Sequence, residues 1–273
     1  MTISTPTTEP LILIAGSGIY PRLIIEGART AGVPRIEIVA FENETSPDLA
    51  ALADAAHWMR VGQLGRCLKA AKKSGAKYAI MAGQIAPKNL FDLRPDFKAL
   101  LIMAKLPRRN AETLFGAVAD ELAKIDIELL PATTYVENHL APSGHIAGPK
   151  AKKRQLDDIA HGHQIAKESS RLDIGQSVIV KNGTVLAVEA FEGTNECIKR
   201  GGALGRGAAT LVKVSKPDQD MRFDVPVIGS TTLDIAAAAG ITTIALEANR
   251  TLLLDRPALT DYANQKNITL HGI

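Results

Sequence analysis

Three short segments in the second half of the chain combine carboxylates, hydroxyls and cations. They are 189–194 (EAFEGT), 213–216 (KVSK) and 220–226 (DMRFDVP). Cleavage of a phosphoanhydride needs carboxylates to hold Mg²⁺ or activate water, and cations to neutralise the charge that develops on the phosphate oxygens. The segments therefore supply the parts for phosphate chemistry. The alternative interpretation is a solvated face crossed by ion pairs.

The polar side chains of these segments divide between metal binding and substrate binding or charge stabilisation. The oxygen ligands for a divalent cation, Mg²⁺ or another, would be Glu189, Glu192, Asp220 and Asp224. The groups that would bind the substrate or stabilise charge on its pyrophosphate are Thr194, Lys213 and Arg222. If the third segment is extended, Asp220, Arg222 and Asp224 share one face, because side chains alternate along an extended chain.

A glycine-containing turn in the first half offers a second candidate site. Gly16, Ser17 and Gly18 directly follow the apolar run 11–15, and Ile19 and Tyr20 lead into a helical pattern. Open α/β sheets bind phosphates at this position, since glycines let backbone N–H groups approach and the helix presents its positive end. A tight turn without a ligand is the alternative.

Gly83 and Gln84 follow another predicted strand, with Lys88 further on. Parallel strands end at the same edge of their sheet, so we expect Gly83 and Gln84 to lie beside the glycine turn and to help bind the substrate.

A dinucleotide site is the competing interpretation of the glycine turn. Glu42 stands where a ribose-binding acid would lie, but Pro21 replaces the third small residue of the fingerprint and removes an N–H donor.

Two basic clusters complete the candidates. Residues 99–106 form an apolar helical run that is followed by Arg108 and Arg109. Such a run could touch anionic lipid or acyl chains, and a core helix is the alternative.

Lys150 begins a second cluster, which has three more cations at 152–154. This cluster could bind a phosphate, and solvated charges at a helix start are the alternative.

Apolar periodicity and turn residues predict the elements that position these groups. Strands are expected at 11–15, 35–41, 77–82, 126–130, 177–180, 184–191, 209–214, 242–246 and 268–271, and helices at 21–31, 63–74, 92–105, 111–125, 150–170, 233–239 and 258–266. The pair Asn182-Gly183 predicts a hairpin. The pattern indicates an α/β fold, with a Rossmann-like N-terminal lobe built on a parallel sheet and a second α/β lobe with a mixed sheet.

The Pro- and Gly-containing stretch 133–149 lacks an apolar period and is the expected linker. It separates a nucleotide- or sugar-binding domain at 1–132 from a catalytic domain at 150–273.

Composition excludes several classes of protein. With 46% hydrophobic and 22% charged residues the chain is globular, and 4% aromatic residues with a net charge of +3 argue against nucleic-acid binding. Its two cysteines lack metal-site spacing. The N-terminus reads as neither an export signal nor an apolar span, so we expect a cytoplasmic protein.

The combination of motifs resembles the LpxI family of UDP-2,3-diacylglucosamine pyrophosphatases. The matching segments are LILIAGSGIYP, AGQIAPK, VEAFEGTNE, LVKVSKPDQDMRFDVPVIG and IALEANRTLLLDR, which span most of residues 11–256. Their order and spacing, rather than any single motif, carry the resemblance.

The resemblance implies a lipid A pathway hydrolase that uses a divalent cation, Mg²⁺ or another. It would cleave UDP-2,3-diacylglucosamine into UMP and 2,3-diacylglucosamine 1-phosphate (lipid X), with water attacking the sugar-side phosphorus. It also implies two lobes around the ligand, a homodimer, and an essential aspartate in an R-x-D-x-P segment, which is Asp224 here. The lipid-linked substrate predicts peripheral contact with the inner membrane. A nicotinamide-dependent oxidoreductase and a non-catalytic nucleotide-binding module remain the alternatives.

Overall fold

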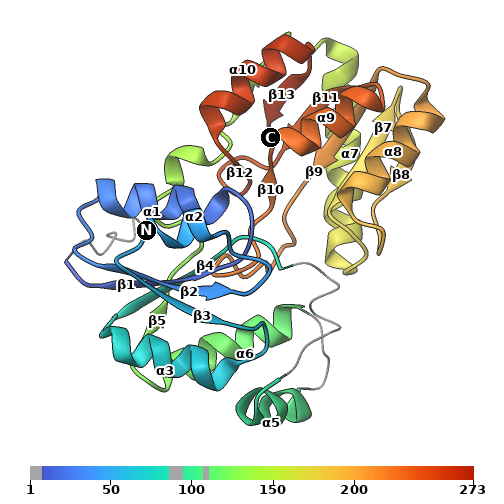
Figure 1. Ribbon diagram of the computed structural model, residues 1–273. Helices are drawn as coiled ribbons and strands as arrows, with labels where there is room; N and C mark the ends of the chain where they lie inside the picture. The colour runs from blue at the N-terminus through green and yellow to red at the C-terminus, as the bar shows by residue number, and fades with distance from the viewer. Residues whose placement is uncertain (1–7, 86–94, 107–110) are drawn as a thin grey trace. The chain divides into compact units, whose positions relative to one another are not determined.

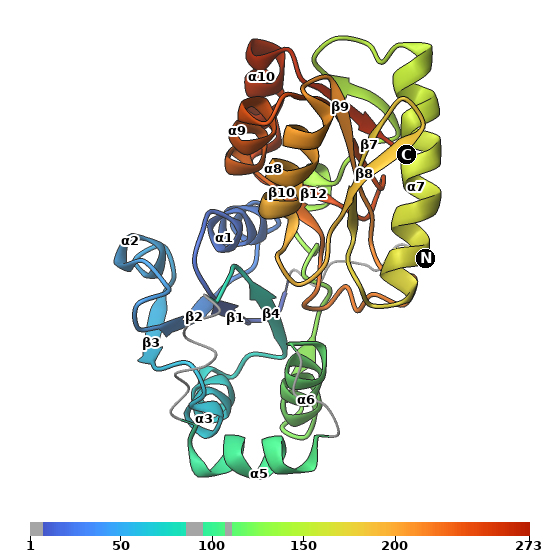
Figure 2. The same ribbon diagram turned by 90° about the vertical axis from the view of Figure 1, so that its right-hand side faces the viewer.

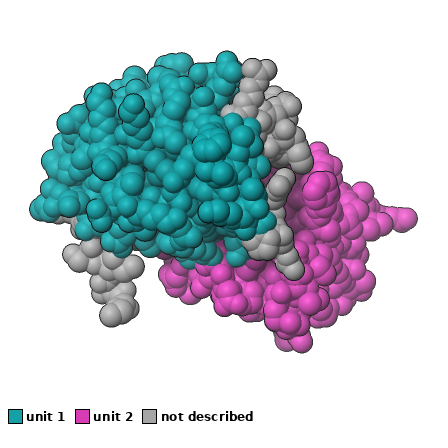
Figure 3. Space-filling model, turned by 90° about the horizontal axis from the view of Figure 1, so that it is seen from below, with its two compact units in different colours: residues 1–137, 220–224 teal, residues 138–219, 225–273 magenta. Residues whose placement is uncertain are grey.

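The computed structural model describes residues 8–85, 95–106 and 111–273. The chain forms two compact units (Figures 1 and 3). Unit 1 contains residues 1–137 and 220–224, and unit 2 contains residues 138–219 and 225–273. The segment 220–224, which the sequence pattern places in the second domain, thus packs with the first unit.

Unit 1 is built on a five-stranded parallel sheet in the order β3-β2-β1-β4-β5. Its strands are β1 (Leu11–Ala15), β2 (Ile36–Phe41), β3 (Ala55–Met59), β4 (Tyr78–Ala82) and β5 (Glu128–Leu129). All five residues of β1 are buried, as expected of a central strand covered on both faces. The predicted Rossmann-like parallel sheet is therefore confirmed.

Helices cover both faces of this sheet. They are α1 (Tyr20–Thr30), α2 (Pro47–Ala50), α3 (Leu64–Ser74), α5 (Phe97–Lys105) and α6 (Ala111–Ala123). Helices α1 and α2 lie on one side of the sheet, and α3, α5 and α6 lie on the other (Figures 1 and 2). Helix α3 ends at Gly75, whose φ of 71° is the left-handed conformation that glycine adopts readily.

Unit 2 is built on a mixed sheet in the order β6-β13-β11-β9-β7-β8. Its strands are β6 (Gly144–Ala147), β7 (Ser177–Lys181), β8 (Thr184–Val188), β9 (Ala209–Lys213), β11 (Ile241–Leu246) and β13 (Thr269–Gly272). Strands β9, β11 and β13 run parallel, whereas β6, β7 and β8 pair antiparallel with their neighbours. A separate parallel pair joins β10 (Val227–Ile228) to β12 (Leu252–Leu253). The predicted mixed sheet is confirmed.

Alternate residues of β7 face opposite layers of helices. The helices are η1 (Glu137–His139), α7 (Lys153–Arg171), α8 (Thr194–Gly205), α9 (Ser230–Ala238) and α10 (Arg256–Lys266). Val178 and Val180 pack in one buried cluster with residues of α7, while Ile179 packs in another with residues of α8, α9 and α10. This is the alternation expected of a strand covered on both faces.

Several elements differ from the predicted ones. The Asn182-Gly183 turn forms the predicted hairpin, but β8 ends at Val188 rather than continuing to 191. Helix α8 was not predicted, because its glycines disfavour helix in the absence of tertiary contacts. A Cβ at Gly201 would lie 2.6 Å from Ile179, and one at Gly202 would lie 2.2 Å from the carbonyl oxygen of Ala239. Close packing of α8 against β7 and α9 therefore requires these glycines.

The expected linker 133–149 holds η1 and β6, and the boundary between the two units falls within it, at 137/138. Across the ranges that the structure describes, no helix is long and apolar enough to cross a membrane.

Candidate functional site

The ends of β1 and β4 meet in unit 1, as the strand order predicts. The backbone N–H of Ser17 donates to the carbonyl oxygen of Gln84 over 2.8 Å, and the N–H of Gln84 donates back to Ser17 over 3.1 Å. The Ser17 hydroxyl adds a hydrogen bond of 3.0 Å to the same Gln84 oxygen. The glycine turn and the Gly83-Gln84 segment thus form one connected structure at the carboxyl edge of the sheet.

Two of the glycines are required by this contact. A Cβ at Gly16 would lie 2.2 Å from the carbonyl oxygen of Gln84, and one at Gly83, whose φ is +93°, would lie 2.7 Å from that of Ser17. Gly18 also has a positive φ, of +92°, but a Cβ there would meet nothing within 4 Å. Gly16 and Gly83 allow the two loops to approach, while the space beside the Cα of Gly18 is open.

Helix α1 begins beside this turn. Its N-cap residue, Ile19, makes no side-chain capping bond, and Pro21 lies in the first turn. The first N–H groups of a helix lack intrahelical partners, so this end can attract an anion. Tyr20 is buried and its hydroxyl donates to the carbonyl oxygen of Ala132 over 2.5 Å. The part of Tyr20 that faces the turn is therefore its backbone.

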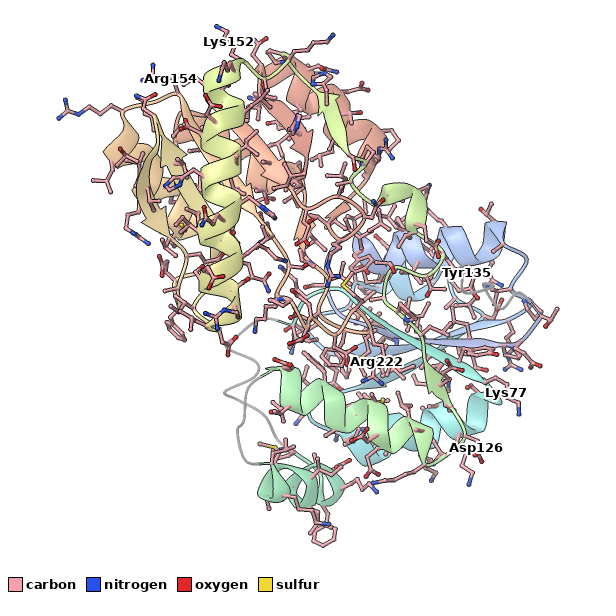
Figure 4. All side chains as sticks on the ribbon, turned by 180° about the vertical axis from the view of Figure 1, so that it is seen from behind. Lys77, Asp126, Tyr135, Lys152, Arg154 and Arg222 are labelled. Carbon is pink, nitrogen blue, oxygen red and sulfur yellow. The ribbon has the colours of Figure 1, made fainter. Side chains whose placement is uncertain are left out.

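The segment 220–224 is a turn rather than an extended strand. The backbone N–H of Asp224 donates to the carbonyl oxygen of Asp220 over 2.9 Å. The expectation that Asp220, Arg222 and Asp224 share one face of an extended segment is therefore wrong, because this local hydrogen bond closes the backbone. Arg222 instead folds back and binds both oxygens of Asp220, with N···O distances of 2.9 and 2.7 Å (Figure 4). These hydrogen bonds hold the pKa of the Asp220 carboxyl below its usual value.

Apolar and backbone contacts hold this turn on unit 1. The ring of Phe223 packs on that of Phe115 with centroids 5.9 Å apart and joins the core between the sheet and helices α3 and α6. The carbonyl oxygen of Met221 accepts from the N–H of Ala132 over 2.8 Å. These contacts fix the backbone at both sides of Arg222, so the turn that carries Asp224 is a built part of unit 1.

A buried polar chain lies in unit 2 at the start of α8. Lys213, the last residue of β9, is only 8% exposed, and its Nζ donates to the Thr194 hydroxyl over 2.9 Å. That hydroxyl lies 2.9 Å from Oε1 of Glu189, to which it donates, and 3.4 Å from the hydroxyl of Ser177. The structure therefore brings together three of the predicted site residues, Glu189, Thr194 and Lys213.

Sequence reasoning missed Ser177. It is fully buried on β7, and its carbonyl oxygen accepts the backbone N–H of Glu189 over 2.8 Å. Its hydroxyl reaches Thr194 only because β7 lies between β8 and β9, so no local spacing signals the contact.

The two glutamates of the 189–194 segment differ in what they bind. Oε2 of Glu189 is buried and has no hydrogen-bond partner in the described parts of the chain. Glu192, by contrast, pairs with Arg200 through Oε1 and accepts the N–H of Ala190 at Oε2, over 3.1 Å. The Arg200 guanidinium holds the pKa of the Glu192 carboxyl below its usual value. Glu192 thus anchors the turn, whereas Glu189 offers an unpaired oxygen.

Both halves of the chain match one protein family. Residues 10–139 match the LpxI N-terminal domain and residues 142–271 match the LpxI C-terminal domain. A curated protein of Caulobacter vibrioides, UDP-2,3-diacylglucosamine pyrophosphatase LpxI, is 30% identical over 272 residues, covering 96% of each chain. The chain belongs to the LpxI family.

Solved structures give weaker likenesses to this LpxI chain. The urea carboxylase of Kluyveromyces lactis superposes with a TM-score of 0.30 at 14% identity, covering 63% of this chain and 12% of that one. The biotin carboxylase domain of the Hydrogenobacter thermophilus 2-oxoglutarate carboxylase gives a TM-score of 0.28 at 17% identity, covering 65% of this chain and 36% of that one. Both scores are too low to support a conclusion about the function of this LpxI chain.

The remaining predicted residues of this LpxI chain lie elsewhere. Lys150 is exposed, before the first turn of α7, and Lys152 and Arg154 extend from that end of the helix (Figure 4). Glu42, the acid of the dinucleotide alternative, forms an ion pair with Arg60. Lys88, Arg108 and Arg109 lie outside the described residues.

The carboxylates of the described residues suit a divalent cation that is bound together with the substrate. Among the described residues, no group of three or more His, Cys, Asp or Glu side chains is arranged to hold a metal ion. Mg²⁺, however, usually keeps several waters and is bound by one or two carboxylates together with substrate phosphates. The unpaired Oε2 of Glu189 is the kind of oxygen that such a site uses, so the donor set suits a cation that arrives with the substrate.

Proposed function

We propose that this LpxI chain hydrolyses the pyrophosphate of UDP-2,3-diacylglucosamine to UMP and 2,3-diacylglucosamine 1-phosphate, a reaction of lipid A biosynthesis. The observation that carries the proposal is the 30% identity to the Caulobacter pyrophosphatase, which extends over 96% of both chains and so includes every segment described above. The buried chain of Lys213, Thr194 and Glu189 supports it, because it supplies charge stabilisation of the kind that phosphoryl transfer requires.

Unit 2 would contribute the cation that stabilises the transition state. An ammonium group in a buried site is shielded less by water, so Lys213 would act strongly on the developing charge of the phosphate oxygens. The Thr194 hydroxyl would hold the ammonium group in place. The N-terminus of α8, with Thr194 as its first residue, would add its positive end.

Unit 1 would contribute residues that bind the head of the substrate, and the carboxylate of Asp224. The open Gly18 position and the first turn of α1 would bind the nucleotide or sugar head, together with Gln84. Asp224 would position the attacking water or the cation. Asp220 and Arg222 would shape its turn through their mutual ion pair, and the guanidinium of Arg222 would add a second positive charge.

The reaction would proceed by attack of water on the sugar-side phosphorus. The bond between that phosphorus and the bridging oxygen breaks, the bridging oxygen leaves with UMP, and the oxygen of water stays on the 1-phosphate of the lipid. A bound Mg²⁺ would neutralise charge on the phosphate oxygens. Glu189 is the carboxylate we propose as its protein ligand, because its Oε2 is buried without a hydrogen-bond partner among the described residues. The oxygens of Asp220 and Glu192 already accept hydrogen bonds.

One experiment tests the proposed reaction. The purified full-length chain is incubated with UDP-2,3-diacylglucosamine and Mg²⁺ in ¹⁸O water, and UMP and the lipid product are analysed by mass spectrometry. We expect UMP without label and a 1-phosphate that carries one ¹⁸O. Binding of the substrate with no UMP after long incubation would support a non-catalytic nucleotide-binding module instead. A nicotinamide absorbance change in a parallel incubation with added nicotinamide dinucleotide would support an oxidoreductase.

Asp224→Asn tests the proposed role of the carboxylate. We expect the variant to bind the substrate but to turn over at least roughly 10²-fold more slowly, as expected when a group that acts in the transition state is removed. Asp218→Asn, which changes an exposed aspartate nearby in the sequence, is the matched control and should keep its activity. Equal rates for both variants would remove Asp224 from the mechanism.

The predicted homodimer and the peripheral contact with the inner membrane are further parts of the proposal. Light scattering after size exclusion would give the mass of the particle in solution and so test the dimer directly.

A further inference from the structure

Helix α5 turns an apolar face toward solvent. Phe97, Leu100, Leu101 and Ala104 follow the i, i+3, i+4, i+7 spacing of a single helix face. That spacing usually marks the face that packs on the core. Here Phe97 is 76% exposed, Leu100 51% and Leu101 46%, whereas the buried residue of the helix is Ala99. We call these four residues the α5 face.

Polar contacts at both neighbouring helices fix the rotation of α5. Asp96 caps the helix, with Oδ1 accepting from the N–H of Ala99 over 2.9 Å, and its Oδ2 accepts the N–H of Gly65 in α3 over 2.7 Å. Lys98 forms an ion pair of 2.5 Å with Glu121 of α6. Because these contacts hold the N-terminal turn of α5 on both helices, exposure of the α5 face is a defined feature of unit 1.

The neighbouring helix α3 adds a basic stripe. Its exposed cations are Arg66, Lys69, Lys72 and Lys73, and it contains no acidic residue. Helix α5 itself exposes Lys98 and Lys105. Both helices lie on the same side of the sheet, and α5 lies farther from the sheet than α3 (Figures 1 and 2). The helix that carries the apolar face therefore packs beside the helix that carries this set of positive charges.

We infer that the α5 face and the basic stripe of α3 dock this protein on a membrane surface that contains anionic phospholipid. Aromatic and leucine side chains enter the boundary between headgroups and acyl chains, while lysine and arginine attract anionic headgroups. The inference identifies the surface behind the predicted peripheral association. It does not depend on turnover, since docking involves none of the proposed site residues.

A second copy of the chain is a poorer occupant of this face. A two-fold dimer through the α5 face would be self-complementary, so each subunit would present the same basic stripe near the interface. Like charges brought together at an interface oppose association. An anionic bilayer satisfies both the apolar and the basic parts of the surface.

Vesicle sedimentation with the full-length chain and no substrate tests the inference. We expect pelleting with phosphatidylglycerol-containing vesicles, weak pelleting with phosphatidylcholine alone, and loss of binding as salt rises. Phe97→Gln with Leu101→Gln, and separately Lys69→Glu with Lys72→Glu, should each lower the partition coefficient roughly tenfold or more. Leu172→Gln removes an exposed leucine of unit 2 and is the matched control, which should bind as the wild type does.

Three outcomes would overturn the inference. The first is a wild-type protein that does not bind anionic vesicles, and the second is a Phe97→Gln, Leu101→Gln variant that binds them as tightly as the wild type does. The third is a dimer that dissociates on those substitutions in sedimentation velocity while no vesicle binding is seen, which would assign the face to a second copy. Hydrolysis of detergent-dispersed substrate is measured in parallel. A variant that loses vesicle binding but keeps this rate separates docking from the proposed function.

Discussion

The ammonium nitrogen of Lys213 lies 2.9 Å from the hydroxyl oxygen of Thr194, although 19 positions separate the two residues in the chain. Lys213 ends strand β9 and Thr194 begins helix α8, so the contact joins the carboxyl end of a strand to the positive end of a helix. The hydroxyl in turn donates a hydrogen bond to Oε1 of Glu189. The geometry is that of a buried lysine held in one position by a hydroxyl that is itself fixed.

Replacing Lys213 should therefore reduce turnover more than binding. Lys213→Met keeps the length of the side chain but removes its charge, and we expect kcat to fall by roughly 10²–10³-fold. Lys199→Met changes an exposed lysine of α8 that pairs with Glu196 and should leave kcat unchanged. A Lys213→Met enzyme with wild-type kcat and a raised KM would show that the lysine binds ground state and transition state equally.

The Thr194 hydroxyl is predicted to act by positioning Lys213. Thr194→Val should lower kcat by about tenfold, because it removes one hydrogen bond from the ammonium group, whereas Thr194→Ser should restore most of the rate. The split between kcat and KM is the second measurement, since a group that orients Lys213 in the transition state should change kcat more than KM. An unchanged kcat and KM in Thr194→Val would leave the residue with a structural role alone.

Divalent cations should be required for turnover, and Glu189 should affect the concentration of cation that is needed. Excess EDTA is expected to abolish UMP formation and added Mg²⁺ to restore it. Glu189→Gln should raise the Mg²⁺ concentration for half-maximal rate by roughly tenfold, because it replaces the carboxylate whose Oε2 is unpaired. Glu196→Gln, an exposed glutamate on α8, is the control. Full activity in EDTA would remove the cation from the proposal.

Stability should depend strongly on Gly16. Gly16→Ala places a Cβ 2.2 Å from the carbonyl oxygen of Gln84, and we expect a loss of about 2–4 kcal/mol in the free energy of unfolding in urea. Gly116→Ala lies in helix α6, where a Cβ would meet nothing within 4 Å, and should stabilise the protein by about 0.5–1 kcal/mol. Equal effects of the two substitutions would contradict the close approach of the two loops.

Alkaline pH should weaken the folded state through buried thiols. Burial raises the pKa of Cys67 from its ordinary value of 9.0 to about 12, with Asp96 contributing to the rise. The unfolded chain therefore loses this proton first, and stability that is complete below pH 9 falls as the pH rises, by about 1.4 kcal/mol per pH unit. Cys67→Ala should flatten the curve of unfolding free energy between pH 9 and 11, while Cys197 maintains a similar slope of its own.

Much of the fold could be predicted from local patterns. The run 11–15 is apolar and ends at glycine, and the strand β1 occupies those residues. Asn182-Gly183 predicts the hairpin that joins β7 to β8. In each case the determining interaction is local, since backbone conformation and apolar periodicity act within a few residues. Strand β3 was missed because its exposed positions hold Ala56 and Trp58, which weakens the alternation of polar and apolar residues.

Only the tertiary structure decided where the site residues belong. The motif residues in 189–194 and 220–226 look alike in sequence, yet the structure assigns 189–194 to unit 2 and 220–224 to unit 1. Phe223 decides this, because its ring packs into the core of unit 1. The tertiary structure likewise pairs Glu192 with Arg200 and Asp220 with Arg222, and leaves Oε2 of Glu189 without a partner among the described residues. Residue type and order are properties of the chain, whereas burial and charge pairing arise only when distant segments meet.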